Sequence, residues 1–256
     1  MTEQHRLNVY LDIETIPAQN PRVLEEIKDD AERAKASIKP PSNYKDEAKI
    51  AEYVLTKQAE IDAETEVKWR KTSFDGASGQ VVAISLAFDD QAPANIYSEN
   101  WASDEASLIE ELYDLLRSAH NPVLERKPLF IGHNIVAFDL RFLLHRSMIL
   151  GVRPPSFIPF DARPWDTTVY DTMVQWAGVG NRVSLDKLCR VFNVPTKGTE
   201  IGDEIDGSLV WDYVRDGRIR DVALYCSGDV ERVRMIHRRM TFAPRDGSKD
   251  ATEELA

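Results

Sequence analysis

The chain is poor in several features that mark whole classes of protein. Its only two cysteines, Cys189 and Cys226, form no CxxC pair, so they predict small core residues rather than a disulfide framework or a zinc site. No run of about 18 apolar residues is present, and residues 1–6 lack the apolar segment of a signal peptide. We therefore expect a soluble cytoplasmic protein without a membrane partner.

Positive charge is also scarce. The 256 residues carry 32 Lys and Arg against 43 Asp and Glu, a formal net charge of -11. This balance argues against a surface that binds nucleic acid through phosphate contacts alone. It still allows an enzyme that holds divalent cations in an acidic pocket and offers phosphates positive charge only there.

The pattern of apolar residues predicts an α/β protein. Strands are expected at 9–15, 80–88, 94–98 and 128–131, with a strand-to-helix junction at 166–173. Helices are expected at 21–36, 45–71, from a Ser103 cap past Leu116, and at 136–150, 185–192 and 218–240. We expect one domain over residues 1–242, with a disordered tail at 243–256.

A helical insertion of about residues 21–72 separates the first two predicted strands. Between Pro21 and Thr72 it contains 11 Lys and Arg against 12 Asp and Glu. Such interspersed charges are typical of a solvated helical surface. The insertion is also a candidate surface for a protein partner.

Two carboxylates lie two residues apart in the first predicted strand, within Val9-Tyr10-Leu11-Asp12-Ile13-Glu14-Thr15. Alternate residues of a strand point to the same face, so Asp12 and Glu14 point the same way. Neighbouring acids in a half-buried strand repel each other unless a cation joins them. The simpler explanation of an isolated Asp-x-Glu is a strand whose acids face solvent.

Two later segments supply further acids. The chain leaves a predicted buried strand at Gly132 and enters a helix, which places Asp139 near the sheet edge where α/β folds bind ligands. By itself, Asp139 is equally well explained by a favourable interaction with the helix dipole. On the last helix, Tyr225 and Asp229 are four residues apart and share a face at the edge of the apolar stripe, where a semi-exposed acid would reach a cleft.

Taken in order, the three segments resemble the three sequence motifs of the DEDD, or DnaQ-like, 3′-5′ exonuclease superfamily. Asp12-Ile13-Glu14 resembles the first motif, Asn134 through Phe138-Asp139 the second, and Tyr225 to Asp229 the third in its YxxxD form, typical of a DEDDy member. The chain looks most similar to stand-alone exonucleases related to the proofreading domain of family-B DNA polymerases. Asp171-Thr172-Met173 and Ser184-Leu185-Asp186 add to this likeness, whereas the insertion is longer than a minimal member needs.

The resemblance implies an RNase H-like α/β fold with a mixed five-stranded sheet, flanking helices and a helical insertion after strand one. It implies a two-metal-dependent 3′-5′ exonuclease that releases nucleoside 5′-monophosphates from nucleic acid with a 3′ end, above all single-stranded DNA. Hard oxygen ligands suit two Mg²⁺ or Mn²⁺ ions, which would bind Asp12, Glu14, Asp139 and Asp229. In this scheme Asp12 bridges both ions, Glu14 and Asp229 complete the nucleophile-side ion, and Asp139 holds the other through water.

Other residues have supporting roles under the same resemblance. Tyr225 would orient the attacking water, since a phenol with a pKa near 10 is a poor free base at neutral pH. Candidate substrate contacts are Thr15, Asn134, Phe138 and Lys197, while His133 is expected to be structural. Three alternatives stay open: an RNase D-like 3′-5′ exoribonuclease, a non-catalytic nucleic-acid or partner-binding module on the same fold, and a globular domain with solvated acids.

Overall fold

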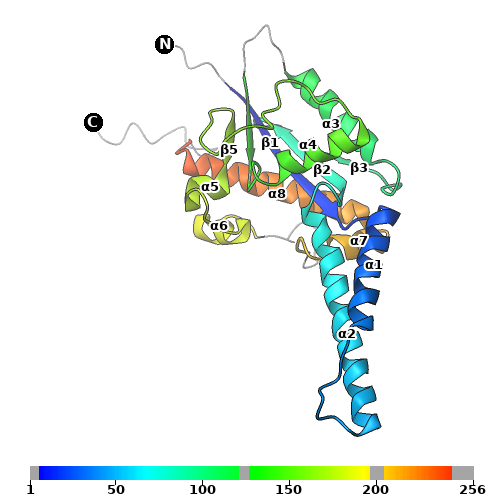
Figure 1. Ribbon diagram of the computed structural model, residues 1–256. Helices are drawn as coiled ribbons and strands as arrows, with labels where there is room; N and C mark the ends of the chain where they lie inside the picture. Colours follow the sequence, from blue (N-terminus) through cyan, green and yellow to red (C-terminus); the bar gives the residue numbers. More distant parts are fainter. Residues whose placement is uncertain (1–5, 121–126, 197–204, 244–256) are drawn as a thin grey trace, which may run out of the picture.

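The computed structural model describes residues 6–120, 127–196 and 205–243. Five strands form one sheet: β1 (Leu7–Ile16), β2 (Gln80–Phe88), β3 (Ala94–Tyr97), β4 (Pro128–Gly132) and β5 (Val169–Asp171). Their order is β3-β2-β1-β4-β5 (Figure 1). β1 pairs antiparallel with β2 and β2 with β3, whereas β4 pairs parallel with both β1 and β5. The predicted α/β fold, with a mixed five-stranded sheet flanked by helices, is confirmed.

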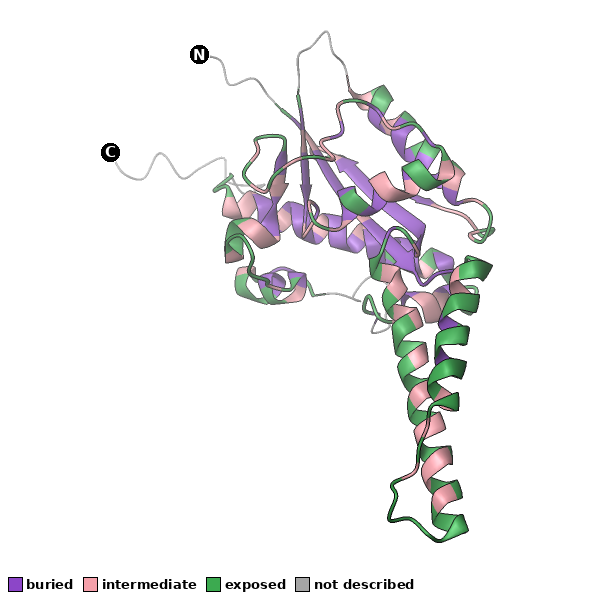
Figure 2. Ribbon diagram, viewed as in Figure 1, coloured by how far each residue is buried: buried purple, intermediate pink, exposed green. Residues whose placement is uncertain are grey.

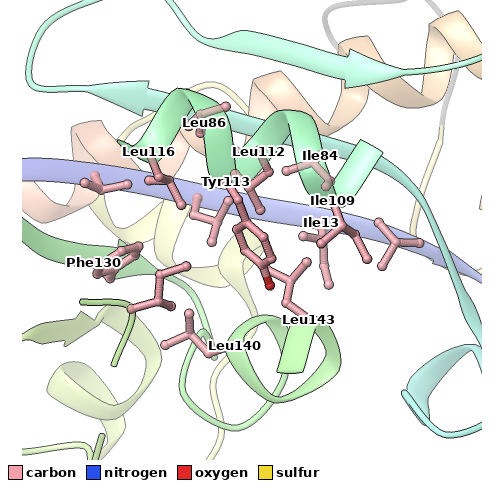
Figure 3. Close-up of a cluster of buried hydrophobic side chains, with 14 of the residues drawn as sticks. Ile13, Ile84, Leu86, Ile109, Leu112, Tyr113, Leu116, Phe130, Leu140 and Leu143 are labelled. Carbon is pink, nitrogen blue, oxygen red and sulfur yellow. The ribbon is translucent and has the colours of Figure 1, made fainter. Parts of the chain in front are cut away.

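The central strand β1 separates the two faces of the sheet. On one face, Val9, Leu11 and Ile13 pack in a core under α3 (Glu105–Ala119) and α4 (Asp139–Leu150). Figure 3 shows α3 residues, including Leu112 and Tyr113, over this strand. Nearly every residue of β1 is buried, as a strand covered on both faces requires.

The other face of β1 is covered by α8 (Ile219–Met240) and holds two separate apolar clusters. Tyr10 belongs to the cluster that includes α6 (Leu185–Phe192), and Ile16 belongs to the one that includes α7 (Val210–Arg215). Asp12 and Glu14 are the two positions between them on this face. The two acids therefore interrupt an apolar surface at a place where α8 crosses it.

The insertion forms a hairpin of α1 (Pro21–Ala36) and α2 (Glu47–Lys71), followed by the short helix η1 (Thr72–Phe74). The hairpin projects from the body of the molecule (Figure 1). α2 has no buried residue, and α1 buries only Ile27 and Ala31, as the exposed colours of Figure 2 show. The two helices expected in this segment are present with nearly the predicted bounds.

Hydrogen bonds close the base of the hairpin. The Ala18 N–H donates to Thr72 Oγ1 at 2.8 Å, and the indole N–H of Trp69 donates to the Ala18 carbonyl at 2.9 Å. The Arg70 guanidinium makes two hydrogen bonds to Asp212 of α7, at 2.8 and 2.9 Å. The two ends of the hairpin thus lie side by side where the chain leaves β1, and the Arg70–Asp212 contact joins them to α7.

Two predicted helix starts are wrong. α4 begins at Asp139 rather than near residue 136, because Asn134 has a φ of 64° and Asp171 accepts hydrogen bonds from the backbone N–H groups of Asn134 and Val136. α3 begins at Glu105 with Asp104 at its N-cap. Ser103 does not cap it, because the Ser103 hydroxyl contacts Asn100 and Asp104 instead.

Some short elements escaped the sequence pattern, and some predictions lie beyond the described residues. α7 and η1 were not predicted, because one or two turns leave little periodicity to detect. The strand-to-helix junction expected at 166–173 is the boundary between β5 and α5 (Thr172–Ala177). Lys197 and all but the first residue of the predicted tail at 243–256 lie outside the described residues. Within the described ranges, no helix combines the length and apolar character needed to cross a membrane.

Candidate active site

The first two acids lie at an irregular point of the central strand. The pairing of β1 with β2 shifts register between Glu14 and Thr15, and such a bulge re-aims side chains locally. Asp12 is half-buried, and Glu14 is 9% exposed. The Cys226 Sγ atom of α8 lies 3.4 Å from both the carbonyl oxygen and Oδ2 of Asp12. The ligand atoms of Asp12, Glu14 and Cys226 all lie within 4.8 Å of one another.

Asp139 reaches β1 where the neighbouring strand ends. The β1–β4 pairing runs only to Tyr10 and Ile131, so the backbone of Ile13 lies beyond it. The Ile13 N–H donates to Asp139 Oδ1 at 3.2 Å, past the last residue of β1 that pairs with β4. The Asp139 carboxylate therefore contacts the backbone of β1 at Ile13, the residue between Asp12 and Glu14.

The turn that delivers Asp139 is closely packed. A Cβ atom at Gly132 would lie 2.7 Å from Ile135 Cβ, so this turn requires glycine. After it, the Asp171 carboxylate holds the loop by accepting from the Asn134 N–H at 3.0 Å, and it also caps α5. Asp171 is fully buried and belongs to the segment whose likeness to the exonucleases was noted in the sequence.

Burial makes the charge of Asp139 costly. The side chain is 3% exposed, and burial first, then the negative charge of Asp12, raise the pKa of Asp139 well above its usual range. Hydrogen bonds from the backbone N–H groups of Asp139 and Ile13 act in the opposite direction. A cation bound beside Asp139 would offset both causes of this shift and favour the ionised carboxylate.

The third segment is more deeply buried than its pattern predicts. Tyr225 is 1% exposed and Asp229 is 4% exposed, so the expectation of a semi-exposed acid at the edge of the apolar stripe is wrong. The reason is that α8 packs against the sheet and is also contacted by α5, α6 and α7. The spacing of apolar residues in the sequence predicted one buried face of α8, whereas the sheet and three neighbouring helices bury more of its surface.

A buried arginine accompanies Asp229. The Arg232 side chain is 1% exposed, and its Nη1 lies 3.1 Å from Asp229 Oδ1. The same guanidinium donates to the carbonyl oxygens of Pro195 and Thr196, at 3.1 and 2.7 Å. A guanidinium with several acceptors can hold a buried carboxylate in a fixed orientation. Arg232 thus ties Asp229 to the segment that follows α6.

Electrostatics relates the acids of the first and third segments. Burial raises the pKa of the Cys226 thiol most, followed by the negative charges of Asp12 and Glu14, with a further contribution from Asp229. Three carboxylates therefore act on one buried sulfur atom. Asp12 and Glu14 thus lie beside Cys226, Asp139 bonds to β1 between them at Ile13, and Asp229 is one helical turn from Cys226 on α8.

The proposed substrate contacts have ordinary structural partners as well. The Thr15 hydroxyl donates to the Ser73 carbonyl at 2.7 Å, and Asn134 is half-buried. The Phe138 ring centroid lies 6.4 Å from that of Phe74 and 5.6 Å from that of Phe142. His133 contacts Thr172 Oγ1 and the Val183 carbonyl through its two ring nitrogens, in agreement with the structural role expected of it.

Two residues at the cluster were not placed there from the sequence. Cys226 was expected only in the core and Arg232 was not singled out, although both lie three residues from Asp229. Residues three apart on a helix are neighbours, and this spacing was the available signal. The sequence did not show that the other side of α8 would bury an arginine.

Comparison with known families agrees with this geometry. A family described as "Predicted 3'-5' exonuclease related to the exonuclease domain of PolB" matches residues 74–254. The chain belongs to this family. The resemblance drawn from the three motifs is thereby confirmed. The matched residues include Asp139, Tyr225 and Asp229, whereas Asp12 and Glu14 precede them.

Among solved structures, the chain is similar to the family B DNA polymerase from the hyperthermophilic archaeon Pyrobaculum calidifontis. The two are 18% identical, with a TM-score of 0.49, over 65% of this chain and 22% of the polymerase chain. The similarity thus spans about a fifth of the polymerase. Among curated proteins, no sequence matches the chain.

Proposed function

We propose that this member of the PolB-related exonuclease family is a two-metal-dependent DEDDy enzyme that removes nucleotides from the 3′ end of single-stranded DNA. The observation that carries the proposal is the placement of Asp12 and Glu14 beside Cys226 of α8, with Asp139 of α4 bonded to β1 between them. On α8, Asp229 is one turn after Cys226 and Tyr225 one turn before Asp229. Each of these acids comes from one of the three motif segments. The products would be nucleoside 5′-monophosphates.

The donor set suits hard divalent cations. Carboxylate oxygens are the preferred protein ligands of Mg²⁺ and Mn²⁺. Burial first, and then the negative charge of Asp12, raise the pKa of Asp139, and a bound cation would offset both. Asp12, Glu14, Asp139 and Asp229 would hold two such ions. Bound there, the ions would acidify a water molecule and neutralise charge on the leaving oxygen. The Cys226 thiol is a softer donor that lies against Asp12 rather than replacing a carboxylate.

The remaining residues would position groups around these acids. Tyr225 would orient the attacking water through its phenol group, and Arg232 would fix the carboxylate of Asp229. Asp171 would act through the loop that it holds, because that loop sets the start of α4 and so the place of Asp139. Thr15, Asn134, Phe138 and Lys197 are the proposed contacts to the terminal nucleotide.

The test is digestion of matched 5′-labelled single-stranded DNA and RNA oligonucleotides, with Mg²⁺, with Mn²⁺ or with chelator. We expect a metal-dependent ladder that shortens from the 3′ end, with DNA cleaved faster than RNA. Asp229→Ala should abolish the ladder, whereas Asp114→Asn, which removes an exposed acid of α3, should not.

Each other outcome points to a different conclusion. Faster cleavage of RNA would move the assignment to an RNase D-like exoribonuclease. Binding without cleavage by well-folded protein would indicate a non-catalytic module. Cleavage that persists in chelator would contradict the metal-dependent chemistry itself.

A further inference from the structure

The base of the α1–α2 hairpin contains a cavity that none of Asp12, Glu14, Asp139 and Asp229 lines. Its volume is about 220 Å³, and residues from four elements line it, among them Thr15, Val67, Lys71, Phe74 and Trp211. Pockets for drug-sized ligands have volumes of about 300–1,000 Å³, so this cavity suits a single ring system. Thr15 directly follows Glu14, which joins the cavity to the acids.

A second, more open hollow of about 500 Å³ continues along the hairpin. It is lined by Ala63, Glu64, Val67, Lys68 and Lys71, and it shares Val67 and Lys71 with the cavity at the base. Ala63, Val67 and Lys71 are spaced by four residues, so they form one row along α2 over a rise of about 12 Å. The two hollows therefore form one continuous surface that leads away from the acids.

The chemistry of this surface fits a polynucleotide strand. Phe74 is 68% exposed, with its ring near Phe138, and exposed aromatic rings stack on bases of any sequence. No ion pair joins Lys71 to another described residue, whereas Lys68 pairs with Asp30 and Arg70 pairs with Asp212. Lys71 is thus a cation on a cavity that Thr15, the residue after Glu14, also lines.

We infer that the Lys71–Phe74 end of the hairpin binds the nucleotides on the 5′ side of the scissile phosphodiester, with Phe74 stacking on a base and Lys71 contacting a phosphate. This inference rests on the proposed exonuclease function. It gives the insertion a role in choosing the substrate, because only a single strand of several nucleotides occupies both the acids and α2. The substrate class is an extended single-stranded 3′ segment rather than a dinucleotide.

The test compares kcat/KM for a single-stranded thymidylate octamer, a thymidylate dimer and the p-nitrophenyl ester of thymidine 5′-monophosphate. The ester is hydrolysed at one phosphodiester but has no nucleotide on the 5′ side. We expect the wild-type protein to prefer the octamer, and Phe74→Ala to reduce the octamer-to-dimer ratio about ten-fold, since a stacked base contributes on that order. Leu55→Ala is the matched control, because Leu55 is an exposed apolar residue of α2 outside both hollows.

The salt dependence of kcat/KM distinguishes a phosphate contact by Lys71 from a purely structural role. Lys71→Ala should make the slope of log kcat/KM for the octamer against log salt concentration shallower by about 0.7, the value for one lost contact to a single strand. Lys49→Ala, at an exposed position near the start of α2, should leave the slope unchanged. If Lys71 only stabilises the C-terminus of α2, Lys71→Ala would instead lower the melting temperature without changing the slope.

The outcomes separate this inference from the proposed function. If the wild type hydrolyses none of the three substrates under metal, the exonuclease function fails and the binding surface fails with it. If the wild type is an exonuclease but both variants keep its octamer-to-dimer ratio and salt slope, the function stands and the inference about the hairpin is wrong.

Discussion

The body of the molecule and the α1–α2 hairpin hold their charged residues in opposite ways. In the body, Asp139, Asp229 and Arg232 are buried between the sheet and its helices. On the hairpin, ion pairs such as Lys35–Asp62 and Lys57–Glu60 lie at the surface. Burying a charge is costly unless it is paired or binds a cation, whereas an exposed pair costs and contributes little.

This difference indicates where charge serves a purpose beyond solubility. The hairpin has nearly equal numbers of positively and negatively charged residues, and water solvates these side chains whether or not they form ion pairs. The body instead keeps acids whose mutual repulsion opposes folding, so a requirement other than stability explains them. Substitutions that remove charge from each region should therefore have very different consequences.

The largest effect is expected for Asp139→Asn. We expect kcat on single-stranded DNA to fall roughly a thousand-fold, or about 4 kcal/mol, because a buried carboxylate proposed to bind metal loses its charge. The metal-free variant should melt at a higher temperature than the wild type, because the raised pKa of Asp139 shows that its charge is unfavourable there. Kinetics and thermal unfolding in chelator measure the two effects, with Asp114→Asn as the exposed control. Full activity in Asp139→Asn would remove this acid from the proposed site.

The next effect concerns added metal. Mg²⁺ or Mn²⁺ at a hundred-fold excess over Kd should stabilise the wild type through mass action by about 2.7 kcal/mol for each of the two proposed sites. Asp12→Asn should blunt this gain, because Asp12 lies against Cys226 and acts on the pKa of Asp139. Thermal unfolding across a metal titration measures it. A melting temperature indifferent to both ions at millimolar concentration would contradict a preformed metal site.

A buried base elsewhere in the body should give the protein acid sensitivity. Burial lowers the pKa of His237 to about 4, and its Nδ1 lies 3.0 Å from the Tyr10 hydroxyl. Because the folded pKa lies below the unfolded value of about 6.5, the unfolded chain binds the proton more readily, and stability is lost as pH falls from 6.5 through 4. The loss is about 3 kcal/mol at most.

The difference in unfolding free energy between the wild type and His237→Asn, followed from pH 7 to pH 4, isolates this contribution. The variant should lose less stability than the wild type over this range. Parallel curves would show that His237 does not titrate in the folded protein as its burial predicts.

A smaller effect is expected where the two regions meet. Arg70→Met removes the pair of hydrogen bonds to Asp212, which lies at the base of the hairpin and is partly exposed. We expect a loss of about 1 kcal/mol in overall stability. Hydrogen exchange should accelerate in α2 more than in β1, because the contact anchors the hairpin rather than the sheet. Equal acceleration in both would mean that the two regions unfold as one unit.

The smallest effect is expected on the hairpin itself. Lys57→Gln breaks the exposed pair with Glu60, and we expect no measurable change in either the melting temperature or kcat. Differential scanning calorimetry and the oligonucleotide assay check this. A loss comparable to that of Asp139→Asn would overturn the contrast between the two regions.

Much of the fold could be read from local patterns. Alternating apolar residues predicted β1, and a continuous apolar run predicted β2, because a strand covered by helices must bury its side chains. The first hairpin helix was predicted by Asn20-Pro21 at its start, and the second by apolar residues at helical spacing after Pro40-Pro41. These signals lie within a few residues of the element that they predict, so the sequence alone contains them.

The sequence by itself also determined the chemical character of the candidate site, by supplying acids in three separate segments with a tyrosine four residues before the last. Only the tertiary structure decided their surroundings. It placed Cys226 against Asp12, buried Asp229 with Arg232, and let Asp171 delay the start of α4 until Asp139. Each of these features depends on how helices and strands pack against one another, which buries a residue or brings distant residues into contact. The local pattern of a single element does not contain this information.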